Sequence, residues 1–104
     1  SDESSNVIIV EDVPDYLSVS EAKTYRITRQ VSGALTIAVE TESYSTSTVI
    51  FETGDVAPSL LIENQAFWVN GNIPSIESYT VYELSLFHDE RVGVMAVLSP
   101  FKLA

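Results

Sequence analysis

The chain has 104 residues, a formal net charge of −10 and no cysteine. This length fits one domain of ordinary size, and the lack of cysteine excludes disulfides and thiolate metal sites. The acidic balance argues against nucleic acid and anionic membranes as partners, because both are bound through Lys and Arg. No segment approaches the roughly 18 apolar residues of a transmembrane helix, so we expect no membrane insertion.

The N-terminal part is predicted to form short strands separated by polar turns. Residues 1–6 are polar and are expected to be a disordered tail, with residues 7–104 forming a single β-sandwich domain. The β-branched run Val7–Val10 is typical of a buried strand. Residues 16–20 alternate weakly and favour a strand, with a short helical turn over residues 18–27 as the alternative.

The next segment alternates clearly between apolar and polar residues. Residues 24–31 and 34–40 each show the period of two that is typical of strands. Ser32-Gly33 between them predicts a hairpin turn. A polar loop rich in Ser and Thr is expected over residues 41–48, followed by a strand over residues 49–51.

Two short apolar runs follow, over residues 59–63 and 66–69, and both are expected to be strands. Asn70-Gly71-Asn72 comes next and is a strong turn signal, because Asn and Gly tolerate positive φ.

The C-terminal part predicts a hairpin of two long strands. Residues 78–87 and 92–98 carry large apolar groups on both faces. This predicts that the first strand is central in its sheet or covered on both sides, and that the second is buried on two sides. The polar residues 88–91 form the turn between them, and Ser99-Pro100 is expected to end the second strand.

These segments amount to about eight short strands, with a turn signal roughly every ten residues. The fold class predicted is therefore all-β, as an antiparallel β-sandwich or a jelly-roll-like domain.

The residues offer little for catalysis or metal binding. His88 is the only histidine, and with Asp89 and Glu90 beside it the segment is typical of a solvated turn. A zinc site needs further ligands, and neither cysteine nor a second histidine exists.

Acidic residues give two weak candidates. Glu40 and Glu42 fall on one strand face, a pattern that can serve glycoside hydrolysis or calcium binding. Glu11, Asp12 and Asp15 cluster without the calcium-loop pattern. Both groups are more typical of solvated surface. We therefore expect no enzyme activity, catalytic residues, cofactor or metal.

Four aromatic residues are the candidate ligand or interface residues: Tyr44, Trp68, Tyr79 and Tyr82. Together they could form a platform on which a sugar stacks. The competing interpretation places Trp68 in the core or in a subunit interface, since it follows Phe67 in an apolar run. Tyr44, in the polar loop, is expected to be exposed.

Several short motifs occur in order between residues 25 and 98, namely Tyr25-Arg26-Ile27, Leu35-Thr36-Ile37, Phe51-Glu52-Thr53-Gly54, Leu60-Leu61-Ile62, Trp68, Pro74, Tyr82-Glu83-Leu84-Ser85-Leu86 and Val92-Gly93-Val94. Their order resembles a β-domain at the C-terminal ends of phage virion structural proteins, such as head-fibre and tail-associated proteins. The chain departs from that pattern at Asp89-Glu90-Arg91, where the pattern has Asp-Gly or Asn-Gly.

The resemblance implies a non-enzymatic virion component, such as a head fibre, a decoration protein or a tail-fibre knob. It implies a homo-oligomer, usually a trimer, with other virion proteins as partners and host-surface attachment, to a glycan for example, as a further role. The alternative from the residues is a monomeric carbohydrate-binding module of an extracellular or cell-surface protein. A small hydrolase using Glu40 and Glu42 is the third hypothesis.

Overall fold

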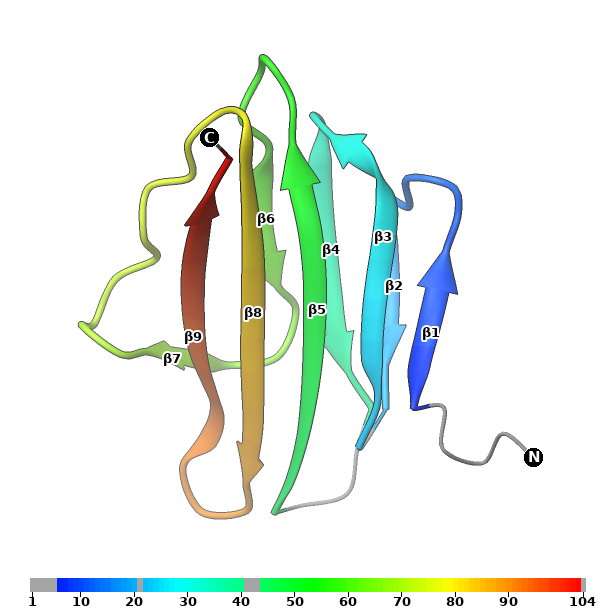
Figure 1. Cartoon of the computed structure of the whole chain (residues 1–104). Coiled ribbons are helices and arrows are strands. Elements are labelled where there is room, and N and C mark those ends of the chain that lie inside the picture. The colour runs from blue at the N-terminus through cyan, green and yellow to red at the C-terminus, as the bar shows by residue number, and fades with distance from the viewer. Residues whose placement is uncertain (1–5, 21, 41–43, 104) are drawn as a thin grey trace.

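A computed structural model describes residues 6–20, 22–40 and 44–103 of the chain. Nine strands form two sheets (Figure 1), and the described residues contain no helix. The strands are β1 (Val7–Val10), β2 (Tyr16–Val19), β3 (Thr24–Val31), β4 (Ala34–Val39), β5 (Ser45–Thr53), β6 (Ser59–Ile62), β7 (Ala66–Trp68), β8 (Thr80–Asp89) and β9 (Gly93–Lys102).

The two sheets differ in size and form the two layers of a sandwich. The large sheet has six strands in the order β1-β3-β5-β8-β9-β7, and the small sheet has three in the order β2-β4-β6. In Figure 1 the small sheet lies behind the large one. The prediction of an all-β sandwich is confirmed, and the strand alternative for residues 16–20 prevails over the helical turn.

The pairing within the sheets corrects the prediction of an antiparallel or jelly-roll-like arrangement. Only β5–β8 and β8–β9 are antiparallel, whereas β1–β3, β2–β4, β3–β5, β4–β6 and β7–β9 are parallel. The reason is that the chain changes sheet at every connection from β1 to β7. Neighbours such as β1 and β3 are therefore separated in the sequence by one strand of the other sheet, and they run in the same direction.

The hairpin predicted at Ser32-Gly33 is wrong for the same reason. β3 and β4 belong to different sheets and meet across the core, so the bend joins two layers as a β-arch. Each strand keeps its alternation, because Val31 on one side and Leu35 on the other both point into the sandwich and are buried. The hairpin predicted from the C-terminal pair is confirmed as β8–β9.

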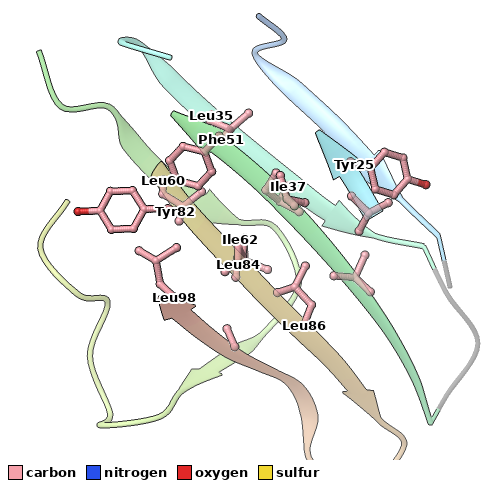
Figure 2. Close-up of a cluster of buried hydrophobic side chains, with 14 of the residues drawn as sticks. Tyr25, Leu35, Ile37, Phe51, Leu60, Ile62, Tyr82, Leu84, Leu86 and Leu98 are labelled. Carbon is pink, nitrogen blue, oxygen red and sulfur yellow. The ribbon is translucent and has the colours of Figure 1, made fainter. Parts of the chain in front are cut away.

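The core lies between the two sheets and is built from alternate residues of the long strands. Phe51 of β5 and Tyr82 of β8 are fully or almost fully buried, and their rings stack with centroids 5.5 Å apart. Figure 2 shows them in one cluster with side chains of both sheets, namely Tyr25, Leu35, Ile37, Leu60, Ile62, Leu84, Leu86 and Leu98. Strands of both layers therefore share one hydrophobic core.

Two strands are longer than predicted. The polar loop expected over residues 41–48 is wrong from Ser45 onwards, because residues 45–48 begin β5, while residues 41–43 lie outside the described residues. The β-branched Thr46 and Thr48 suit a strand and face away from the core.

Ser99-Pro100 does not end β9, which continues to Lys102 with Pro100 opposite Tyr82. β7 pairs with β9 only at residues 94–96, so β9 is the edge of the sheet at Pro100. An edge strand tolerates proline, which has no backbone N–H.

Side chains fasten the loops to the sheets. Thr53 Oγ1 donates to the carbonyl of Glu77 at 2.7 Å and accepts from the backbone N–H of Thr80 at 3.0 Å, which ties the long loop before β8 to β5. Asn64 binds both backbone groups of Val39 and so continues the pairing of the small sheet beyond β6. Buried backbone groups at these strand ends are thus satisfied.

Candidate functional site: the outer face of the large sheet

The outer face of the large sheet is open, and β8 and β9 are covered on one side only. On β9 the inward residues Val94, Ala96 and Leu98 are buried, whereas Met95 and Val97 between them are 44% and 42% exposed. The prediction that residues 92–98 are buried on two sides is therefore wrong for the single chain, whereas the alternative of a central strand for residues 78–87 is confirmed, since β8 lies between β5 and β9. A second layer packs against only one face of this sheet.

Strand register arranges the outward side chains in rows that run across the sheet. One row passes from β5 to β7 and consists of Thr46, Phe87, Met95 and Phe67. The next row passes from β1 to β9 and consists of Val7, Thr24, Thr48, Ser85 and Val97. We call these two rows the uncharged rows, because none of their side chains is charged and their chemistry is apolar or hydroxyl.

The following outward rows, farther from the β8–β9 turn, carry charge. The third row contains Arg26 and Glu83 on either side of Ile50. The fourth contains Glu52, Val81 and Phe101. The outer face is therefore divided into an uncharged half near the β8–β9 turn and a charged half at the opposite end of β8.

Two shallow hollows lie on the uncharged half. One, of about 430 Å³, is lined by residues of β7 and β9, including Phe67, and by Val69 and Val92 next to these strands. The other, of about 350 Å³, lies over β5 and β8. Met95 and Val97 line both hollows, so the two are neighbours on one surface. Their walls are mainly apolar and suit apolar side chains better than a polar small molecule.

The structure does not bring the four candidate aromatic residues together. Tyr82 is 3% exposed, and its hydroxyl accepts the backbone N–H of Glu77 at 2.7 Å inside the fold. Trp68 is half-buried, packs against the core and also lines the hollow between β7 and β9. A single stacking platform made of all four residues is therefore not formed.

Tyr44 and Tyr79 are exposed but lie far apart. Tyr44 precedes β5 at the end where Ser45 pairs with His88, and Tyr79 precedes β8 at its other end. Residues 80–88 of β8 separate the two ends, and nine strand residues span roughly 30 Å. Both tyrosines have positive φ, 62° and 50°, which marks them as turn residues.

The turn at His88 is organised by Asp89. Its Oδ1 accepts the backbone N–H groups of Arg91 at 2.9 Å and Val92 at 3.0 Å, as a turn aspartate does. Glycine follows at Gly93, whose φ is +117°. This carboxylate thus closes the hairpin without the Asp-Gly or Asn-Gly pair that is common in such turns.

The acidic candidates lie on the surface. Glu40, Glu11, Asp12 and Asp15 are exposed, and Glu42 lies outside the described residues. Within residues 6–20, 22–40 and 44–103, no three His, Cys, Asp or Glu side chains come close enough to hold a metal ion.

Among the residues that the structure describes, two pKa values are shifted, and both belong to exposed groups remote from the uncharged rows. The hydrogen bond from Tyr16 to Glu63 raises the pKa of the tyrosine. The hydrogen bond from Lys102 to Glu77 raises the pKa of the lysine. These contacts join surface segments and show no arrangement for proton transfer.

The residues that sequence reasoning missed are Phe67, Phe87, Met95 and Val97. The sequence signal for this face is the apolar character of both faces of residues 79–87 and 92–98, which predicts packing against neighbouring copies but does not single out these four residues. An apolar face can equally be covered by another molecule.

Comparisons with protein-family models, with curated proteins and with solved structures find no match. In the part of the chain that the structure describes, no helix has the length and apolar character needed to cross a membrane.

Proposed function

We propose that the chain is a non-enzymatic structural domain of a phage virion that works as a homo-oligomer, as part of a head fibre, a decoration protein or a tail-fibre knob. The observation that carries the proposal is the uncovered apolar face of β8 and β9. Met95 and Val97 of β9, with Phe67 of the adjacent β7, are each between 42% and 44% exposed on this one face. Exposed apolar patches of this kind mark interaction surfaces.

The virion assignment is supported by the order of sequence motifs. Their apolar residues, among them Leu35, Ile37, Phe51 and Leu84, lie in the same core. This is what a shared fold with the virion β-domains requires. The trimer, the other virion proteins as partners and the host-surface role follow from the same resemblance.

The monomeric carbohydrate-binding module remains the alternative because Tyr44 and Tyr79 are 60% and 57% exposed. Their separation means that each would have to bind a sugar by itself. Aromatic stacking at one ring is weaker than the multiple polar and apolar contacts of a concave site. The oligomeric proposal therefore has the stronger structural support.

The experiment that tests the proposal is light scattering on a size-exclusion column at micromolar concentration. We expect a mass that is a multiple of 11.4 kDa, three-fold for a trimer. A strictly monomeric species contradicts the proposal and directs the next experiment to a glycan array with tryptophan fluorescence as the readout. The virion assignment is tested separately by mass spectrometry of purified particles of the phage that encodes the chain, in which the chain should be present.

A further inference from the structure

We propose that the two uncharged rows are the centre of the contact between copies of this chain. This inference rests on the proposed homo-oligomer and adds to it the surface and the residues. The occupant of the outer face is then a second copy, which presents the same rows. The charged half of the face forms the rim of the contact.

The distribution of charge favours a second copy over a partner of other chemistry. The chain carries a net charge of −10, so two copies repel each other wherever their acidic surfaces approach. The uncharged rows let the copies meet while Glu52, Glu83 and the other acids stay towards the edge of the contact or outside it. A basic partner would be attracted to the acidic surface instead of this half-face.

The size of the face is appropriate for such a contact. The four long strands β3, β5, β8 and β9 span roughly 600 Å² in projection, from strand spacing and rise. A standard interface buries about 800 Å² per partner, and side chains add area to the projection. The molecule measures 40 × 37 × 24 Å, and the view in Figure 1 looks onto this broad face.

The relief of the face also suits self-association. Phe67 and Met95 stand beside the two hollows, so apolar side chains of one copy have apolar hollows to enter on the other. Thr48 and Ser85 line the hollow over β5 and β8 and offer hydroxyl groups that can both donate and accept. An apolar centre with a polar rim is the usual anatomy of a protein interface.

The competing surface is the edge strand β1. Val7, Ile8 and Ile9 are 50%, 38% and 53% exposed, and β1 pairs only with β3. Copies could join edge to edge there. Such a contact would not bury Met95 or Val97, so variants on β9 separate the two possibilities.

The first test introduces a charge into the uncharged rows. Val97→Glu places a carboxylate at their centre, whereas Phe101→Glu places one on the same strand and face in the charged half. Both residues are exposed, so both variants should fold with unchanged circular dichroism. We expect Val97→Glu to weaken association at least about 30-fold and Phe101→Glu to change it less than about five-fold, measured by light scattering over a dilution series.

The second test uses the absence of cysteine, so that one introduced thiol is the only one. Ser85→Cys lies in the uncharged rows, and Ser99→Cys lies in the third row beside Glu83. Under mild oxidation or with a short bismaleimide, we expect covalent dimers from Ser85→Cys in much higher yield than from Ser99→Cys. This readout does not depend on a destabilising substitution.

The outcomes distinguish this inference from the proposed function. If the unmodified chain is monomeric, the homo-oligomer and this inference both fail. If it is oligomeric, but Val97→Glu leaves its mass unchanged and Ser85→Cys cross-links no better than Ser99→Cys, only this inference is overturned. If Val97→Glu alone dissociates the oligomer and Ser85→Cys cross-links, the uncharged rows are the contact.

Discussion

The first six strands and the last two hold together in different ways. From β1 to β6 the chain crosses between sheets at every bend, so strands adjacent in the sequence contact each other through side chains. β8 and β9 are also adjacent in the sequence but pair directly, from Thr80–Lys102 to Asp89–Gly93. In the first region, consecutive strands are held together by side-chain packing between the sheets. In the second, β8 and β9 are held together by backbone hydrogen bonds.

This difference shows what a pattern of alternating residues determines. Alternation says which side chains of a strand are buried. It does not say with which strand the backbone groups pair. A bend between two alternating segments is therefore compatible with both a hairpin and an arch. The four pairs of variants below test the comparison between the arched region and the hairpin.

The largest effect is expected at Phe51, on the strand that joins the two regions. β5 pairs with β3 of the arches on one side and with β8 of the hairpin on the other, and Phe51 is completely buried. Phe51→Ala should lower the free energy of unfolding by about 3–5 kcal/mol, through lost burial and the cavity left behind. Urea denaturation followed by tryptophan fluorescence and by circular dichroism measures it.

The matched control is Phe101→Ala, which removes the same ring from an exposed position and should change stability by less than about 0.5 kcal/mol. Both spectroscopic probes should report one transition in each variant. Two separated transitions in Phe51→Ala, with only one of them shifted, would show that arches and hairpin unfold independently and that β5 does not join them.

The two bends can be compared directly through their glycines. Gly93 closes the hairpin with φ +117°, and an added Cβ would lie 3.2 Å from the carbonyl oxygen of Gln65. Gly33 lies in the arch between β3 and β4, with no atom within 4 Å of an added Cβ and no positive φ. The hairpin therefore requires its glycine, and the arch does not.

Gly93→Ala should cost about 1–3 kcal/mol because alanine is strained at that φ. Gly33→Ala should leave stability unchanged or raise it by about 0.4–1 kcal/mol, since it restricts the unfolded chain. Thermal unfolding of the two variants side by side measures both. Equal losses would mean that the arch bend is as constrained as the hairpin, contrary to the geometry.

These bends also show how much of the structure could be predicted from the sequence. The all-β class, the strand positions to within a few residues and the buried set around Phe51 and Leu84 follow from alternation and turn residues. The sheet to which β4 belongs does not follow, because Ser32-Gly33 is an equally good bend for an arch. The two-sided apolar character of residues 79–87 and 92–98 predicts a contact with neighbouring copies, but alternation alone does not tell whether Met95 and Val97 or Val94 and Ala96 face the core.

A smaller effect is expected at Asn64. Its side chain forms hydrogen bonds with the backbone of a neighbouring strand, whereas β8 and β9 form such bonds between their backbones. Its Oδ1 accepts the N–H of Val39 at 2.8 Å, and its Nδ2 donates to the carbonyl of Val39 at 3.3 Å. Asn64→Ala should cost about 1–2 kcal/mol, because two backbone groups lose their partner at a half-buried site where water can partly replace it.

Amide hydrogen exchange is the specific readout for Asn64. The N–H of Val39 should exchange faster in Asn64→Ala than in the unmodified chain. Gln65→Ala, at the exposed neighbouring position, should leave both the exchange of Val39 and the stability unchanged. Unaltered protection of Val39 in Asn64→Ala would show that the end of the small sheet does not depend on this side chain.

The smallest effect, and one of opposite sign, is expected at Ser47. Ser47 lies on the core-facing side of β5, opposite Leu86 of β8, and is 3% exposed. No group in the described part of the chain lies within hydrogen-bonding reach of its Oγ. Burying a hydroxyl without a partner costs free energy, so Ser47→Ala should leave stability unchanged or raise it by up to about 1 kcal/mol.

Thr53 provides the contrast, because it lies on the same strand and face at the other end of β5. Its hydroxyl binds Glu77 and Thr80 and is completely buried, so Thr53→Val should lose about 1–3 kcal/mol. Urea denaturation of both variants gives the comparison. A loss in Ser47→Ala as large as that in Thr53→Val would mean that the Ser47 hydroxyl is hydrogen-bonded in solution, and the end of β5 next to the uncharged rows would then be fixed by polar contacts as its other end is.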